Sequence, residues 1–374
     1  MRTSLKAMAT VVAAGALLAT AACSPPEDDK SSSSGGSSAA TATSASAAGG
    51  MDALVAAAKK EGKLTTIALP PDWANYGEVI SAFETKYGIK VTSTSPDYSS
   101  QEEINAVNQL KGTGRQPDVL DVTPAVALAN TKLFAPYQVS GWADIPADRK
   151  EASGLWFQDY SGIMSVGYDS AKVPAPSSLA DLMKPAYKGK VALNGDPTQA
   201  GAAINGVMMA SLANGGSLDD ISKGVSYFTS LKKAGTFTPV QATTATRTNG
   251  TTPVVFDWDY LNAAATAEIP TWKTFIPEGV VLSGFYCQAI NKDAAHPAAA
   301  RLWEEFLYSD EGQNLWLKGL SRPVRMDAMK AAGTLDEAAA AKLPAASGTP
   351  VAMSDEQSTA AKDYLAKNWA KAIG

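Results

Sequence analysis

The sequence has very little of the residues on which metal and hydrolase chemistry depend. Among 374 residues there is one histidine, His296, and there are two cysteines, Cys23 and Cys287. These three side chains cannot supply a multi-ligand zinc site or a histidine-dependent catalytic triad. We therefore expect no enzyme of either kind and no cofactor. His296 precedes a proline at a predicted helix start, where we expect a solvated loop residue.

An excess of basic residues is also absent. Lys and Arg total 32 against 37 Asp and Glu, which gives a formal net charge of −5. A nucleic-acid-binding protein normally carries a positive field over one face, so we expect no nucleic-acid partner. With 45% hydrophobic and 18% charged residues, the composition is that of an ordinary soluble chain that can bury one large core or two medium ones.

The N-terminus has the pattern of an export signal. Arg2 and Lys6 precede a weakly polar, Ala-rich stretch over residues 7–22, which is typical of a secretory signal peptide. Small residues stand directly before Cys23, and this arrangement resembles the lipidation motif of bacterial lipoproteins. We predict a signal peptide over 1–22 and a lipid-anchored Cys23 that holds the exported protein at the outer face of the cell membrane. The alternative is a plain signal peptide followed by an incidental cysteine.

The segment after Cys23 lacks aromatic and large aliphatic side chains. Residues 24–50 are mostly Ser, Gly and Ala. Such a segment cannot bury enough apolar surface to offset the entropy lost on ordering. We predict a disordered segment over 23–50 and a folded part that starts at residue 51.

From residue 51 onward, strand and helix patterns alternate. The strand patterns lie at residues 63–69, 89–94, 117–122, 162–168 and 190–193, and the helix patterns at 52–61, 77–87, 178–184, 198–214 and 217–234. This alternation predicts an α/β fold with doubly wound, parallel sheets. The pattern restarts near residue 162, which suggests two lobes, and a cleft between lobes is the default place for a ligand.

Four stretches of the folded part together resemble the extracellular solute-binding proteins of ABC importers. They are "DALVAAAKKEGKLTTIALPPDWANYGEVISAFETKYGIKV", "RQPDVLDVTP", "SLADLMKPAYKGKVALNGDPTQAGAA" and "QAINKDAAHPAAARLWEEFLYSDEGQNLWL". The resemblance covers residues 51 to about 329 and is nearest to the groups that bind polyamines, ferric iron or phosphonates. It implies a type II periplasmic-binding fold: two doubly wound lobes around a hinged cleft, with lobe one over 51–162 and 288–374 and lobe two over 163–287. It also implies a small-molecule solute, a membrane permease as partner and no catalysis; we expect a monomer.

Ligands of open α/β sheets bind beyond the carboxyl ends of the strands. The loops at those ends contain the candidate ligand-binding residues Asp72, Trp73, Tyr76, Asp97, Tyr98, Ser99, Ser100, Thr198, Gln199, Asp257, Trp258, Asp259 and Tyr286. Acidic and aromatic side chains dominate this set, and the loops contain no Lys or Arg. Carboxylates and aromatic faces together hold ammonium groups, so we expect a cationic amine such as a polyamine.

Other ligands stay open. Ser99, Ser100, Thr198 and the turn at 199–201 offer hydroxyl and N–H groups of the kind that hold a phosphonate. Ferric-iron members of the resembled family usually present two neighbouring tyrosines, whereas Cys287 follows Tyr286 here, which weakens the iron hypothesis. A remote alternative is an exported glycan-acting enzyme that uses Asp257 and Asp259 as its carboxylate pair.

Overall fold

The chain folds into a mixed α/β structure, seen in a computed structural model. The structure describes residues 39–344, 346 and 348–374. The predicted signal peptide, the predicted lipidation site Cys23 and the first part of the predicted flexible segment lie outside these residues. The α/β class expected from the alternating patterns is confirmed.

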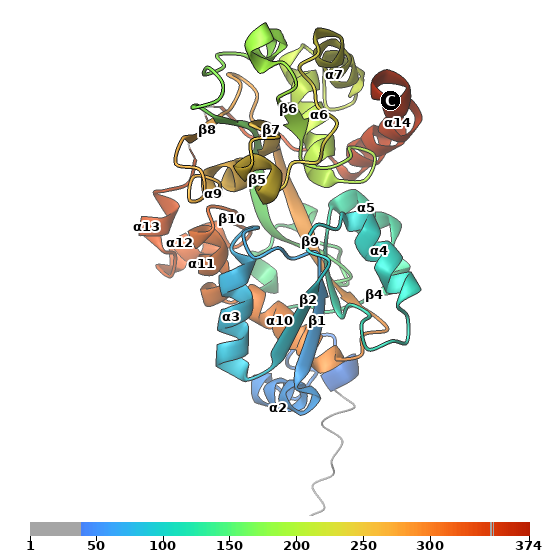
Figure 1. Ribbon diagram of the computed structural model, residues 1–374. Coiled ribbons are helices and arrows are strands. Elements are labelled where there is room, and N and C mark those ends of the chain that lie inside the picture. Colours follow the sequence, from blue (N-terminus) through green and yellow to red (C-terminus); the bar gives the residue numbers. More distant parts are fainter. Residues whose placement is uncertain (1–38, 345, 347) are drawn as a thin grey trace, which may run out of the picture. The chain divides into compact units, whose positions relative to one another are not determined.

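The main sheet has the strand order β3-β9-β5-β7-β6 (Figure 1). Strand β5 (Phe157–Asp169) pairs with β9 (Ser283–Asn291) along its first half and with β7 (Val254–Trp258) along its second half, antiparallel in both cases. Strand β3 (Val119–Val122) is antiparallel to β9, and β6 (Val191–Leu193) is parallel to β7. The short strands β4 (Phe134–Ala135), β8 (Trp272–Phe275) and β10 (Arg322–Pro323) add to β9 and β5.

The sheet is therefore mixed, and the expectation of parallel sheets holds only in part. Parallel neighbours need a long crossover, usually a helix. The neighbours of β5 are β9 and β7, which come much later in the chain and run antiparallel to it. The predicted boundaries of the two lobes stay a prediction.

A separate parallel pair, β1 (Lys63–Ile67) and β2 (Lys90–Thr94), is joined by helix α3 (Tyr76–Tyr87). Val79 and Phe83 of α3 are buried, as the apolar spacing predicts. The helix ends at Gly88, whose φ of 68° is left-handed, a conformation that glycine adopts without steric cost. This strand-helix-strand unit is the one predicted from the sequence.

The remaining helices lie around the sheet (Figure 1). Helix α2 (Met51–Glu61) packs on α10 (Pro297–Leu307), and α6 (Gly201–Ala213) packs on α7 (Ser222–Ala234). The others are α4 (Ser100–Gln109), α5 (Pro124–Ala129), α8 (Thr244–Thr248), α9 (Asp259–Ala264), α11 (Asp310–Lys318), α12 (Met326–Ala332), α13 (Glu337–Ala340) and α14 (Asp355–Ile373). Within the described part of the chain, no helix has both the length and the apolar character needed to cross a bilayer.

Residues 39–50 pack against the folded part, so the prediction of disorder up to residue 50 is wrong for this stretch. Ala39, Ala42, Ala45 and Ala48 are buried at every third position. The carbonyl of Ala42 accepts a hydrogen bond of 2.6 Å from Nε of Arg301, a residue of α10. The prediction failed because it counted only large apolar side chains, whereas methyl groups on a closely packed backbone also remove apolar area from water.

The C-terminal helix α14 contacts both α7 and α5 (Figure 1). Its buried face consists of Ala361, Leu365, Trp369 and Ile373, at the spacing of one helical stripe. The Trp369 ring lies 5.6 Å from the ring of Phe228 on α7. The helix thus joins two parts of the chain that the sequence analysis assigned to different lobes.

Candidate functional site

A cavity of about 300 Å³ lies where the loops after β1, β2 and β6 meet helix α8. Its lining comes from residues within 68–73, 96–103, 194–202 and 241–247, together with Asp121, Leu261 and Tyr286. These loops follow the carboxyl ends of their strands, where the sequence analysis expected a ligand.

Most of the predicted ligand-binding residues line this cavity. They are Asp72, Trp73, Asp97, Tyr98, Ser99, Ser100, Gln199 and Tyr286. Ser99 also begins helix α4, where its backbone N–H donates to Oε2 of Glu102 at 2.7 Å, the capping box expected from the sequence.

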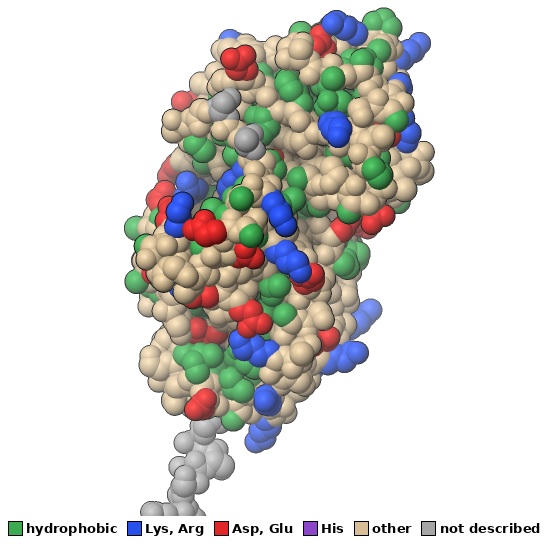
Figure 2. Space-filling model, turned by 90° about the vertical axis from the view of Figure 1, so that its left-hand side faces the viewer, with side chains coloured by type: hydrophobic (Ala, Val, Ile, Leu, Met, Phe, Trp, Pro, Cys, Tyr) green, Lys and Arg blue, Asp and Glu red, His purple; other side chains and the backbone are tan. Residues whose placement is uncertain are grey.

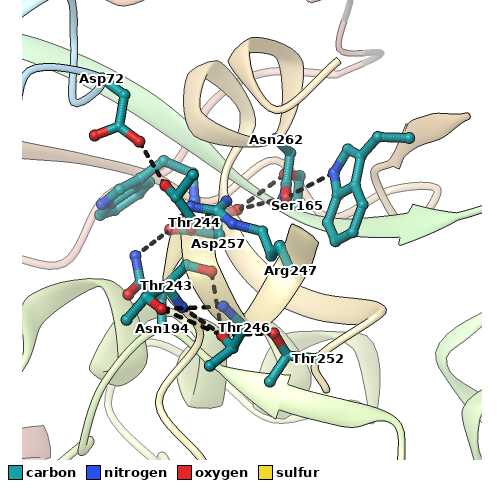
Figure 3. A network of polar contacts seen from close by, with 12 residues as sticks. Asp72, Ser165, Asn194, Thr243, Thr244, Thr246, Arg247, Thr252, Asp257 and Asn262 are labelled. Atoms are coloured by element: carbon teal, nitrogen blue, oxygen red, sulfur yellow. Dashed lines mark hydrogen bonds and ion pairs between the residues drawn. The ribbon is translucent and has the colours of Figure 1, made fainter. Parts of the chain in front are cut away.

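The predicted cluster around Trp258 lies behind the cavity wall and is fully buried. Oδ1 of Asp257 accepts a hydrogen bond of 2.9 Å from Nδ2 of Asn194, and its Oδ2 lies 3.6 Å from Nη1 of Arg247 (Figure 3). Oδ2 of Asp259 pairs with Nη1 of Arg322 at 2.8 Å. The two carboxylates therefore have separate cationic partners from the chain itself, and they do not form a catalytic pair on an open surface.

Burial weakens both of these acids in spite of their arginine partners. Desolvation raises the pKa of Asp257 to about 6, against the lowering effect of Arg247. Desolvation likewise raises the pKa of Asp259, against the effect of Arg322. In each case the nearby arginine lowers the pKa of the carboxyl group and so favours its ionised form.

Three other predicted residues also lie outside the cavity lining. Tyr76 is buried and its hydroxyl donates to Oδ2 of Asp121 at 2.9 Å. Trp258 packs against Gly284 so closely that an added Cβ would lie 2.3 Å from its ring. Thr198 donates its hydroxyl to Oδ1 of Asp196 at 2.8 Å. Tyr76 begins helix α3 and Trp258 ends strand β7, and both side chains are buried in the core.

Aromatic rings form one wall of the cavity. The rings of Trp73 and Tyr286 meet edge to face with centroids 5.7 Å apart. Nε1 of Trp73 donates to the hydroxyl of Tyr160 at 2.7 Å, and the buried ring of Tyr260 lies behind Trp73 at 6.2 Å. This packing holds Trp73 in a fixed orientation, because its neighbours contact both the ring edge and the indole nitrogen.

A group of buried carboxyl side chains lies beside this aromatic wall. Desolvation raises the pKa of Asp121 to about 6. Burial, together with the nearby charge of Asp121, raises the pKa values of Glu103 and Asp159 well above their ordinary range. Burial thus favours the protonated form of Glu103 and of Asp159, and Asp159 hydrogen-bonds to Asp121.

Arg247 is one of the cavity residues that are missing from the predicted set. It belongs to helix α8 and is 8% exposed. Its side chain extends from α8 to Asp257 (Figure 3). The sequence feature that could have indicated a buried arginine was the acidic pair around Trp258, because burying carboxylates without a cationic partner is costly. That requirement was assigned to a cationic ligand, whereas Arg247 and Arg322 meet it.

A contact at the rim joins two distant parts of the chain. The hydroxyl of Thr244 on α8 donates to Oδ2 of Asp72 in the loop after β1, at 2.5 Å (Figure 3). A second cavity, of about 330 Å³, is lined by both residues and by Arg247. In the described part of the chain, no three His, Cys, Asp or Glu side chains cluster in a way that could hold a metal ion.

Comparison with known proteins gives a family and a fold. The model of the family described as bacterial extracellular solute-binding protein matches residues 121–347. No curated protein matches the sequence.

Solved structures resemble the chain at low identity. AfuA from Actinobacillus pleuropneumoniae, a periplasmic binding protein with exogenous fructose-6-phosphate bound, is 18% identical with a TM-score of 0.63, over 83% of this chain and 98% of AfuA. Iron-bound HitA from Pseudomonas aeruginosa is 18% identical with a TM-score of 0.59, over 83% of this chain and 99% of HitA. A provisionally assigned spermidine/putrescine ABC transporter from Listeria monocytogenes is 14% identical with a TM-score of 0.61. The match covers 83% of this chain and 99% of the Listeria chain. The fold is that of the type II periplasmic-binding proteins.

Proposed function

Because the chain belongs to the family of bacterial extracellular solute-binding proteins, we propose that it captures a small organic amine and delivers it to the permease of an ABC importer. The observation that carries the choice of solute is the cavity wall formed by Asp121, Trp73 and Tyr286. The solute leaves the site chemically unchanged.

This wall has the properties that an ammonium group requires. Oδ2 of Asp121 accepts hydrogen bonds from Tyr76 and Tyr160, and the carboxylate also shares a hydrogen bond with Asp159. It has no Lys or Arg partner among the described residues, and a buried carboxylate without a cationic partner gains from a cationic ligand. The neighbouring rings of Trp73 and Tyr286 add cation–π attraction, worth about 0.5–2 kcal/mol.

A small oxyanion is the second candidate. Arg247 and the start of helix α6 both line the cavity, and guanidinium groups and helix N-termini favour anions. Ferric iron has less support, because Cys287 is buried in β9 and does not replace the second tyrosine expected of iron-binding members.

The proposal includes a lipid anchor at Cys23. The small residues before this cysteine and the positive start of the chain support it. Two acyl chains hold a protein on a membrane far more firmly than one, so the captured solute would be released close to the permease.

A binding screen tests the function directly. The full exported chain is heated with putrescine, spermidine, choline, ethylphosphonate, fructose 6-phosphate and ferric citrate in turn. A solute that binds only the folded protein stabilises it by about 2.7 kcal/mol at 100 times its dissociation constant, which is a clear rise in Tm. Failure of every solute, and of a wider metabolite panel, would contradict a solute-binding role.

Calorimetric titration of variants then tests the amine. Asp121→Asn should weaken binding of the amine by about 2–5 kcal/mol, as for truncation of one partner in a buried charge pair. The control Asp327→Asn, at an exposed position of α12, should leave affinity unchanged. Amine affinity that survives Asp121→Asn would reject the proposed wall.

A further inference from the structure

Arg247 holds a guanidinium group whose hydrogen-bond donors are unused. The residue is 8% exposed, and its Nη1 has no hydrogen-bond acceptor. The side chain makes one ion pair, to Oδ2 of Asp257 at 3.6 Å, which is too long for a hydrogen bond. Asp257 therefore fixes the position of the guanidinium (Figure 3) and leaves its N–H groups without acceptors among the described residues.

The N-terminus of helix α6 lies in the same cavity. Ala200 occupies the N-cap position and has no side-chain oxygen to cap the first turn. Gly201 and Ala202, the first residues of the helix, line the cavity, and Gly201 lies so close to Thr123 that an added Cβ would be 2.1 Å from it. Uncapped N–H groups at a helix start attract anions.

Most acidic side chains of the cavity already accept hydrogen bonds from the chain itself. Asp72 accepts from Thr244, Asp196 accepts from Thr198, and Glu102 caps α4. Glu103 accepts from the backbone N–H of Asp121 at 3.2 Å, and burial raises its pKa well above the ordinary range. Asp121 hydrogen-bonds to Asp159 but has no Lys or Arg partner among the described residues, and Nη1 of Arg247 has no hydrogen-bond acceptor. Asp97 lies at the exposed rim.

We propose that the solute is a zwitterion, with its ammonium group against Asp121, Trp73 and Tyr286 and its oxyanion against Arg247 and the first turn of α6. This inference rests on the proposed solute-binding function and specifies the ligand class of the same cavity. A simple cation would leave the buried guanidinium donors without acceptors, and a simple anion would leave the buried Asp121 carboxylate without a cationic partner. Either outcome is unfavourable for a buried charged group.

Charge-matched probes on a common carbon skeleton test the proposal. The first set is 4-aminobutanoate, butylammonium and butanoate, and the second is 2-aminoethylphosphonate, ethylammonium and ethylphosphonate. In calorimetric titrations of the wild type, at least one zwitterion should bind at least about tenfold more tightly than both of its single-charge relatives, since it gains charge-assisted hydrogen bonds at both ends.

The variant Arg247→Met/Asp257→Asn removes the guanidinium without leaving a buried, unpaired carboxylate. It should bind the zwitterion no more tightly than the matching amine, while its affinity for the amine stays within about threefold of wild type. Arg115→Gln, at an exposed position outside the cavity, is the matched control and should retain the preference. Thermal unfolding confirms that each variant is folded before titration.

Three results would overturn the inference. They are equal affinities for zwitterion and amine in the wild type, an undiminished preference in the double variant, and a complete lack of zwitterion binding. The last result separates the two proposals, because a purely cationic or anionic solute found in the wider screen would leave the solute-binding function intact.

Discussion

The single histidine of the sequence is expected to make stability depend on pH through one hydrogen bond. His296 is half-buried rather than solvated, and its Nδ1 lies 2.8 Å from Oδ2 of Asp118. Asp118 is fully buried and also accepts from the backbone N–H of Thr65 at 2.7 Å and of His296 at 2.9 Å. One carboxylate thus joins β1, the start of β3 and the start of α10.

The direction of the pH effect follows from this contact. The hydrogen bond to Asp118 raises the pKa of His296 above its ordinary value, assisted by the charge of Glu61 and opposed by burial and by Lys63. A raised pKa means that the folded state binds the proton more tightly than the unfolded state. The stabilisation is therefore complete below about pH 6.5, the ordinary histidine pKa, and is lost as the pH rises through the higher pKa of the folded state.

The perturbation is His296→Ala. At pH 5.5 it removes a hydrogen bond from a charged imidazolium to a carboxylate, and at pH 9 it removes one from a neutral imidazole to the same carboxylate. Bonds to charged groups are worth about 1.5–3 kcal/mol, so we expect a loss near the upper end of this range at pH 5.5 and near the lower end at pH 9. Urea unfolding of wild type and variant at both pH values measures the difference. Asp121 and Asp257 also titrate near pH 6, but their effects are common to both proteins and cancel in the comparison.

Nuclear magnetic resonance gives an independent check, because a protein with one histidine shows one imidazole. Its titration midpoint should lie above 6.5 in the folded protein. A midpoint at or below that value, or a destabilisation by His296→Ala that is the same at pH 5.5 and pH 9, would refute the reasoning.

Four further outcomes are expected. Trp369→Ala should cost about 3–5 kcal/mol of unfolding free energy, since it empties the interface between α14 and α7; a loss below 1 kcal/mol would contradict this. Gly284→Ala should lower the Tm, because its Cβ would lie 2.3 Å from the Trp258 ring, whereas Gly114→Ala, with open space around it, should not. Cys23→Ser should move the protein from the membrane fraction to the soluble fraction; continued membrane association argues against the lipid anchor. Saturating solute should reduce the radius of gyration in X-ray scattering if the cleft closes by a hinge, and an unchanged radius argues against closure.

The elements near the N-terminus of the folded part were predictable because local signals define them. Helix α2 ends at Gly62 and α3 at Gly88, both left-handed glycines, and α4 begins at the Ser99–Glu102 capping box. Caps and apolar spacing depend on a few consecutive residues. The strand partners were not predictable in this way, because the antiparallel pairing of β5 with β9 joins residues more than 100 positions apart.

The cavity was predictable at the level of loops and less so at the level of side chains. The rule that ligands bind beyond the carboxyl ends of strands selected the loops that contain Trp73, Tyr98 and Gln199, which line the cavity. The rule does not say which side of a strand end faces the cavity. Tyr76 and Trp258 were selected with the same loops, but their side chains are buried in the core.

Arg247 shows why charge counting in sequence cannot separate a ligand from a neighbour in the fold. A buried carboxylate at Asp257 demands a positive partner, and an ammonium ligand or an arginine from another element satisfies that demand equally well. Arg247 stands ten positions earlier in the chain, on a five-residue helix, with no local pattern that connects it to the strand. Once the fold supplies this partner, the acidic pair no longer indicates a cationic solute. Asp121 still does, because it lines the cavity and has no Lys or Arg partner among the described residues.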